Sequence, residues 1–207
     1  MSMKDMTVTA LCELTASASP APGGGSISAM SGAYAAALVC MVAKLTLEKE
    51  GYQDVREEME AIHQEADSLR NDLLEDIQKD AESFDAFMVA LKLPKETDEE
   101  KALRREAMQD ALKGASQVPL GIARKCLKAQ KLAVRALEIG NVNTASDAMV
   151  GVLLGRAATL GGVNNVLINL GGIKDEEFVA RMRAACEELT DIANQQEANG
   201  QAALMSR

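Results

Sequence analysis

Aromatic residues and positive charge are both scarce in this sequence. Only 2% of its 207 residues are aromatic, and 22 Lys and Arg against 31 Asp and Glu give a net charge of −9. Nucleic-acid binding requires a basic footprint, and single-strand binding adds stacking aromatics. Sheets also favour aromatic and β-branched side chains, whereas Ala, Leu, Met, Glu and Lys favour helices. The composition therefore argues against a nucleic-acid partner and favours an all-α fold.

Metal ligands and membrane-spanning runs are scarce as well. The chain has one His, His63, and four Cys at positions 12, 40, 126 and 186, with no spacing typical of zinc ligands. We interpret the Cys as reduced, buried thiols of a cytoplasmic protein, and His63 as a surface residue. Residues 27–43 are nearly uncharged but fall short of the roughly 20 apolar residues that cross a bilayer. Residues 1–14 lack the apolar run of a secretory signal. We expect no metal and no membrane partner.

The hydrophobic content of 47% suffices for one ample core, so residues 1–207 are expected to form a single domain. The hydrophobic periodicity predicts an antiparallel bundle of long helices without a sheet. The expected helices cover residues 7–15, 26–50, 53–92, 97–139, 145–160 and 175–203.

Helix boundaries follow from caps and breakers. Thr97 with Glu100 forms a capping box, and Ser26 and Asp175 are expected N-caps. Gly114 and Pro119 are expected to break or kink the helix that contains them. The glycine pairs at 161–162 and 171–172 are expected to interrupt the helical pattern. Residues 166–168 between them are the one segment that could be extended.

The first candidate site is a glycine loop. Its residues are Pro22, Gly23, Gly24, Gly25 and Ser26, directly before a small-residue helix. Three glycines and a helix N-terminus suit a carboxylate or phosphate, because backbone N–H groups and the dipole both favour an anion. A tight turn before a crowded helix explains the same residues. The composition alone leaves both interpretations open.

The second candidate is Asp80. An apolar stripe runs along one helical face, with residues at 66, 69, 73, 77, 84, 87 and 91, and Asp80 occupies the position that interrupts it. A carboxylate that faces a bundle interior has a raised pKa unless it is paired, which suits acid–base catalysis. The alternative is a structural Asp bonded to a neighbouring helix end. Asp76 and Asp85 lie at the edges of the same face and are weaker candidates.

Two further polar clusters are candidates. Asn141, Ser146 and Asp147 crowd a helix start, where ordinary capping explains much of the pattern. A second group, Asn164, Asn165 and Asn169, lies between the two glycine pairs. Such amides either satisfy loop backbone or bind a polar heterocycle.

Several motifs in order resemble the cyclodeaminase/cyclohydrolase family of folate enzymes, across essentially the whole chain. The resemblance begins with Ala-Pro-Gly-Gly-Gly-Ser at 21–26 and Met-Val-Ala-Lys-Leu-Thr at 41–46. It continues through Asp-Ala-Glu-Ser-Phe at 80–84, Leu-Lys-Leu-Pro-Lys at 91–95 and Val-Pro-Leu at 118–120. Gly-Asn at 140–141, Ser-Asp at 146–147 and Asn-Val-Leu-Ile-Asn-Leu at 165–170 complete it.

This resemblance implies an all-helical fold that dimerises, a tetrahydrofolate-derived substrate, and Asp80 as the catalytic carboxylate. The implied reaction forms or opens the one-carbon bridge between folate nitrogens 5 and 10. A cyclodeaminase closes the bridge of 5-formiminotetrahydrofolate and releases ammonia, whereas a cyclohydrolase opens 5,10-methenyltetrahydrofolate with water. No metal and no tightly bound cofactor is required. The motifs serve both activities equally.

Binding roles follow from the same resemblance. The glycine loop and Ser26 are expected to hold an anionic part of folate, most plausibly its glutamate carboxylates, with help from Lys44, Lys174 or Arg156. Contacts to the pterin, or support of the site, are expected from Asn141, Ser146, Asp147, Asn165 and Asn169. Two rivals are a non-catalytic folate-binding or scaffolding homodimer and a purely structural bundle. Retention of Asp80 argues weakly against both.

Overall fold

The computed structural model describes residues 2–207, and all the regular structure in that range is helical. The all-α prediction is therefore confirmed. Short 3-10 turns occur at Met3–Asp5, Gln53–Val55 and Val142–Thr144. The α-helices are α1 (Val8–Thr15), α2 (Gly24–Leu47), α3 (Arg56–Leu91), α4 (Asp98–Ile139), α5 (Ala145–Leu170) and α6 (Glu176–Met205).

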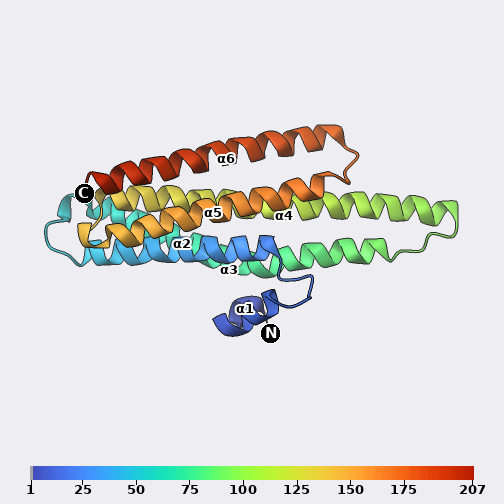
Figure 1. The fold of residues 1–207 in the computed structure, drawn as a ribbon, viewed down its shortest axis with the longest axis horizontal. Helices are drawn as coiled ribbons and strands as arrows, with labels where there is room; N and C mark the ends of the chain where they lie inside the picture. Colours follow the sequence, from blue (N-terminus) through green and yellow to red (C-terminus); the bar gives the residue numbers. More distant parts are fainter. Residues whose placement is uncertain (1) are drawn as a thin grey trace.

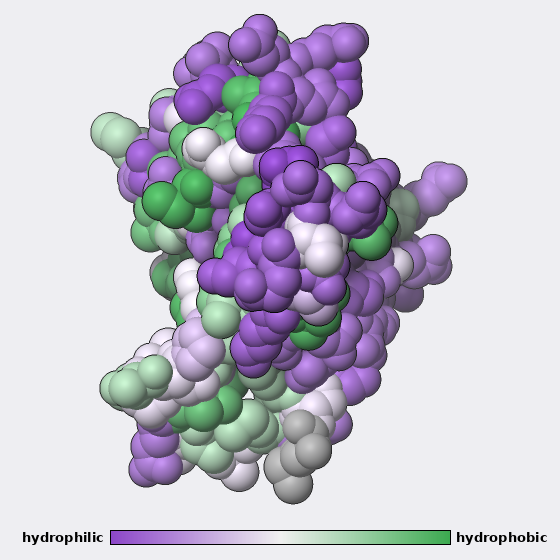
Figure 2. Space-filling model, turned by 90° about the vertical axis from the view of Figure 1, so that its right-hand side faces the viewer, coloured by the Kyte–Doolittle hydropathy of each residue, from purple (hydrophilic) through white to green (hydrophobic). Residues whose placement is uncertain are grey.

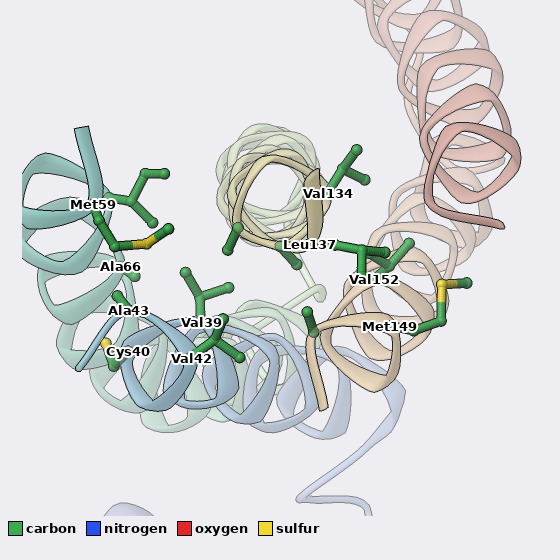
Figure 3. Packing of buried hydrophobic residues seen from close by; sticks show 14 residues of the cluster. Val39, Cys40, Val42, Ala43, Met59, Ala66, Val134, Leu137, Met149 and Val152 are labelled. Atoms are coloured by element: carbon green, nitrogen blue, oxygen red, sulfur yellow. The ribbon is translucent and has the colours of Figure 1, made fainter. Parts of the chain in front are cut away.

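Helix α4 lies at the centre of the bundle. The helices α3, α2, α5 and α6 follow one another in an arc around it, and each packs on its neighbour and on α4. The short α1 stands apart below the bundle (Figure 1), and Leu11 is its one buried residue. Figure 3 shows one section of the core, where Val39 and Val42 of α2 meet Leu137 of α4 and Val152 of α5.

Two of the three predicted N-caps, Thr97 and Asp175, are confirmed. Thr97 and Glu100 exchange both hydrogen bonds of the capping box at the start of α4. The Asp175 side chain accepts from the Phe178 N–H at the start of α6. Because both helix starts are fixed by local side chains, short-range sequence rules locate them correctly.

The predicted interruption at the glycine pair 171–172 is confirmed, because α5 ends at Leu170, but the predicted breaks at Gly114, Pro119 and 161–162 are wrong. α4 runs unbroken through Gly114 and Pro119, and α5 continues through 161–162 to Leu170, so 166–168 is helical. A Cβ on Gly161 would lie 2.3 Å from the Ser28 hydroxyl of α2. The glycine is therefore explained by close helix packing rather than by a turn.

Two smaller predictions also need correction. His63 is partly buried and its Nε2 atom has no hydrogen-bond partner among residues 2–207, so it is not a plain surface residue. Of the four free thiols, Cys12 is exposed and the other three are buried.

The two helical segments 24–47 and 142–170 are long and apolar enough to span a bilayer by length and composition, although the most apolar stretch of the first is 61% buried within the bundle.

Candidate active site

Asp80 of α3 lies against the N-terminus of α2. Its Oδ2 atom accepts a hydrogen bond from the Ser26 hydroxyl at 3.0 Å, and the same hydroxyl lies 2.9 Å from the Ile77 carbonyl. Ser26 is fully buried in the first turn of α2, and Gly23 occupies the N-cap position. The prediction of Ser26 as N-cap is therefore wrong, because its side chain is directed across to α3 instead of back to its own helix.

The glycines of the loop are explained by two side chains that lie directly on them. A Cβ on Gly25 would be 2.1 Å from Asp80 Oδ1, and a Cβ on Gly24 would be 3.0 Å from Asn165 Nδ2. Any larger residue at 25 would displace the carboxylate. The positive end of the α2 dipole thus faces an anion of the protein itself. Whether the loop also holds a substrate anion stays a prediction.

Two effects act on the Asp80 carboxyl group in opposite directions. Burial raises its pKa above the ordinary value of 3.8, and the hydroxyl and backbone N–H of Ser26 pull the pKa down. Burial is the larger effect, so the protonated form is favoured relative to a carboxyl in water. A carboxyl group of this kind is suited to accept a proton and return it in successive steps of a reaction.

Asp80 opens into a cavity of about 320 Å³ between α3, α4, α5 and the α1–α2 loop. This volume is at the low end of the roughly 300–1,000 Å³ typical of small-molecule pockets. The lining residues are Pro20, Ala21, Gly23, Asp80, Ala81, Ser83, Phe84, Phe87, Ala115, Asn165, Ile168 and Asn169.

Phe84 and Phe87 in this cavity were expected in the core. Phe84 is 38% exposed and Phe87 is half-buried, so the apolar stripe leaves the bundle interior after Asp80. The rarity of Phe in this sequence is the signal that could have located them. The chain has three Phe, and two of them lie within two turns of the one carboxylate that interrupts the stripe.

The amides Asn165 and Asn169 reach the cavity from α5. Asn165 donates to the Gly161 carbonyl at 2.8 Å, and Asn169 donates to the Ala115 carbonyl at 2.8 Å. Ala115 lies four residues before Pro119, which has no N–H to offer it. Asn169 therefore supplies the missing donor of α4 and at the same time ties α4 to α5 at the cavity wall.

The two other carboxylates of this helical face have different roles. Asp76 is the more deeply buried, with 5% of its surface exposed, and it pairs with Lys125 at 2.5 Å and Lys79 at 3.0 Å. Asp85 is exposed. Asp80 is thus the one carboxyl of the three that lines the cavity without an ion-pair partner among residues 2–207.

Four predicted binding residues lie at the opposite end of the same subunit. Lys44 is about 30 Å along α2 from Gly24, at 1.5 Å per residue. Asn141 donates to the Leu45 carbonyl and caps the turn before α5, so it joins that end of the bundle. Ser146 and Asp147 follow in the first turn of α5. Within one chain, these residues do not meet Asp80.

The remaining predicted residues are also accounted for. Pro22 is buried beneath the loop, and Asn164 is exposed on α5. Arg156 pairs with Glu197 of α6 at 2.8 Å, so it faces away from the cavity. Lys174 lies in the exposed α5–α6 turn.

A second cavity, of about 190 Å³, lies between the N-terminal segment and helices α2 and α3. Its walls are mostly apolar, as at Met30, Tyr34 and Leu74, and its two cations are already paired with Glu75 and Asp67. It offers no carboxyl for proton transfer. Within residues 2–207, no three His, Cys, Asp or Glu side chains are placed to share a metal ion.

Comparison with known proteins agrees with this geometry. The sequence profile of the Formiminotransferase-cyclodeaminase family matches residues 7–188. The chain is 42% identical over 172 residues to the methenyltetrahydrofolate cyclohydrolase of Methylorubrum extorquens, covering 83% of each sequence. It is 34% identical to the formimidoyltransferase-cyclodeaminase of Gallus gallus, of which it spans 33%. The crystal structure of formiminotetrahydrofolate cyclodeaminase from Thermotoga maritima superposes with a TM-score of 0.88 at 32% identity, covering 98% of both chains. The chain therefore belongs to the formiminotransferase-cyclodeaminase family.

Proposed function

We propose that this protein forms or opens the methenyl bridge of 5,10-methenyltetrahydrofolate, with Asp80 as the proton carrier. The observation that carries the proposal is the position of Asp80. It is a carboxyl with a raised pKa, held by Ser26, in a cavity that also gathers two of the three Phe of the chain. Relatives named as a cyclohydrolase and as cyclodeaminases support the substrate class.

The first candidate reaction is hydrolysis, favoured by the cyclohydrolase relative at 42% identity, which the chain matches over most of both lengths. The Asp80 carboxylate takes a proton from water as the water oxygen bonds to the methenyl carbon. The bond from this carbon to nitrogen 5 then breaks as the proton is returned to nitrogen 5. The second proton of the water is released to solvent as the formyl C=O forms, so one proton is lost overall. The product is the 10-formyl form, and Asp80 ends as it began.

The second candidate reaction is deamination, favoured by the close match to the Thermotoga maritima cyclodeaminase over 98% of both chains. Nitrogen 10 attacks the carbon of the protonated formimino group on nitrogen 5, and Asp80 accepts the proton that nitrogen 10 releases. Asp80 then protonates the leaving amine, so that ammonia departs and the methenyl bridge remains. One carboxyl performs both transfers, because the proton that it accepts from nitrogen 10 is the proton that it gives to the leaving amine.

The residues that line the cavity suggest an orientation for the substrate. Phe84 and Phe87 offer ring faces, and aromatic stacking contributes about 0.5–1.5 kcal/mol beyond the buried area. The carbonyl oxygens of Asn165 and Asn169 are available to the N–H groups of a pterin, since the Nδ2 groups of both amides donate to backbone carbonyls. The folate rings would then lie beside Asp80, and the glutamate end would extend past Ile168 at the rim.

We further propose a cytoplasmic homodimer that uses no tightly bound cofactor, nucleic acid or membrane. Three buried free thiols suit a reducing compartment. The net charge of −9 opposes binding to a polyanion. A non-catalytic folate-binding dimer is the alternative that turnover measurements address.

The deciding experiment supplies purified protein with each substrate separately and follows the methenyl absorbance. A rise with 5-formiminotetrahydrofolate identifies a cyclodeaminase, and an accelerated fall with 5,10-methenyltetrahydrofolate identifies a cyclohydrolase. Folate binding without either change would leave a binding protein and refute the catalytic proposal.

Replacement of the proton carrier gives the first prediction. Asp80→Asn keeps the shape of the side chain but removes its acid–base function, so kcat should fall about 10²-fold or more. The control is Asp85→Asn, which removes an exposed carboxyl from the same helix and should leave kcat unchanged. Near-normal turnover by a folded Asp80→Asn protein would refute the assignment.

A further inference from the structure

A buried ion pair lies one helical turn before Asp80. Asp76 of α3 precedes Asp80 by four residues, and it is the more deeply buried of the two. Its Oδ2 atom accepts a hydrogen bond from the Lys125 ammonium group of α4 at 2.5 Å, and its Oδ1 atom accepts one from Lys79 at 3.0 Å. The proton transfer described above uses none of these three groups. Their presence so close to Asp80 therefore needs its own explanation.

The spacing of the two carboxyl groups makes them neighbours. Residues four apart on an α-helix lie on the same face, with Cβ atoms about 5–6 Å apart. At that separation, one ionised carboxylate disfavours the ionisation of another unless a cation lies beside it. Without a cation, the charge of Asp76 would add to the burial that already opposes ionisation of Asp80.

Solvent does little to screen the charge of Asp76. Figure 2 shows the end of the molecule that holds the α3–α4 connection, where hydrophilic side chains cover much of the surface. Charges exposed on such a surface act weakly on one another, because water and salt screen them. The Asp76 side chain is 7% exposed, so its charge acts on its neighbours mainly through protein. The cation that balances it must therefore also come from the protein.

Lys125 provides that balance from a second helix. Its side chain is 31% exposed, compared with 58% for Lys79, so water weakens the Lys125 contact less. Helix α4 is held closely at this point, because the neighbouring Cys126 is fully buried and its thiol lies 3.8 Å from the Ser28 carbonyl oxygen of α2. Lys125 is therefore the principal partner of Asp76.

The other ionisable groups around the pair contribute less. Asp72 and Glu75 of α3 are exposed, and Glu75 pairs with Lys4 of the N-terminal segment. On α4, burial raises the pKa of the Cys126 thiol, which keeps it neutral. Helix α2 presents small uncharged residues here. Among the residues that the structure describes, Asp80 is the one ionisable residue that lines its cavity.

We propose that Lys125 sets the charge balance of the Asp80 site: its ammonium group neutralises Asp76 and thereby leaves Asp80 free to ionise. This role rests on the proposed proton transfer, which needs an ionised Asp80 to accept the proton. A cation inside the cavity would pair with Asp80 directly and disfavour the protonated form, which the return of the proton requires. Lys125 acts through Asp76 and touches no substrate, so it is a positioning residue.

Titration of the Asp80 carboxyl group by NMR tests the proposal without substrate. The Asp80 signal is identified by its absence from the spectrum of Asp80→Asn. Lys125→Met leaves Lys79 alone to balance Asp76, so the pKa of Asp80 should rise by roughly one pH unit. Asp76→Asn leaves both lysines without their carboxylate, so the pKa of Asp80 should fall. The double variant keeps the net charge of the wild-type cluster, and its Asp80 pKa should return close to the wild-type value.

The opposite signs distinguish a charge effect from a packing effect. Lost packing would disturb the double variant most, whereas charge balance restores it. An unmoved Asp80 pKa in folded Lys125→Met, or shifts of the same sign in both single variants, would overturn the proposal. Removal of one partner of a buried pair is destabilising, so Lys125→Gln, which keeps a donor without the charge, repeats the test if Lys125→Met does not fold.

Lys128→Met is the matched control. Lys128 is the next cation of α4 that pairs with α3, through Glu65. Glu65 lies 15 residues before Asp80, which is about 22 Å along the helix at 1.5 Å per residue. Lys128→Met should therefore leave the pKa of Asp80 unchanged, and a rise equal to that in Lys125→Met would overturn the specific role of Lys125.

The pH dependence of kcat/KM extends the test to catalysis. Its acid limb should move to higher pH in Lys125→Met and to lower pH in Asp76→Asn, in step with the NMR titration. Movement of the Asp80 pKa without movement of the limb would support the charge balance but refute Asp80 as the proton carrier. An inactive wild type would refute the proposed function, while the NMR titration would still decide whether Lys125 sets the charge at Asp80.

Discussion

At the scale of single residues, the proposed proton transfer depends on the hydrogen bond between Ser26 and Asp80. Burial disfavours the Asp80 carboxylate, and the Ser26 hydroxyl and N–H favour it. The hydroxyl is itself fixed, because it also lies 2.9 Å from the Ile77 carbonyl. A small change at Ser26 should therefore alter the pKa of the catalytic group without removing it.

Ser26→Ala tests this directly. Since the hydroxyl lowers the pKa of Asp80, its removal should raise that pKa, and the acid limb of the kcat/KM profile should move to higher pH. Activity at high pH should change little, because Asp80 is then ionised in both proteins. The matched control is Ser83→Ala, whose hydroxyl bonds only the Asp80 backbone carbonyl and should not move the limb. An unmoved limb in Ser26→Ala would separate Ser26 from proton transfer.

Asp80 should also limit stability. Its pKa is raised on folding, so the folded protein binds this proton more tightly than the unfolded chain does. The resulting stabilisation is complete below the ordinary pKa of 3.8 and is lost as pH rises through the folded-state pKa. At neutral pH the buried charge therefore opposes folding, and Asp80→Asn should increase the free energy of unfolding there but not near pH 3. Urea titrations at both pH values check this, and an equal gain at both would indicate a cause other than ionisation.

At the scale of elements, the first turn of α2 makes room for the site. Gly25→Ala would place a Cβ 2.1 Å from Asp80 Oδ1, so the carboxylate must move by about 1 Å or more. A displacement of that size can reduce turnover about 10²-fold. Gly121→Ala on α4 meets nothing within 4 Å and should instead stabilise the protein by about 0.5–1 kcal/mol, with normal kcat. Steady-state kinetics and thermal unfolding of both variants separate the two effects.

Local sequence rules predicted the helices well and their interruptions poorly. Capping at Thr97 and Asp175 involves neighbours in sequence, so short-range rules suffice. Pro119 was expected to break α4, yet the carbonyl it leaves unpaired is satisfied by Asn169, 54 residues from Ala115 along the chain. Such compensation is a tertiary contact, and no window of sequence contains it.

The candidate site was predictable in part for the same reason. Asp80 interrupts a periodic stripe, which is a local signal. The structure places it in a cavity that Asn165 and Asn169 also line. Phe84 and Phe87 continue that stripe, but α3 extends beyond the start of α2, so no helix covers them there. Periodicity identifies a face of a helix and does not say how far along the helix that face is covered.

At the scale of the whole molecule, the family motifs lie at two opposite ends of the bundle. The motifs around Asp80 and those around Lys44 and Asn141 lie at opposite ends of α2 in one chain, although family resemblance assigned both to one site. Sequence resemblance identifies residues of a site without stating which subunit provides them.

The proposed homodimer should make the stability of the protein depend on its concentration. Association that occurs only in the folded state raises Tm as concentration rises, by mass action. Wild-type protein should therefore unfold at higher temperature when concentrated from about 1 to 100 µM, and dilution should lower its specific activity together with its Tm. Leu153→Glu should weaken this dependence on concentration, because it places a charge at an exposed apolar position of α5. Differential scanning calorimetry across the series checks both proteins, and a wild-type Tm that does not vary with concentration would contradict folding coupled to dimerisation.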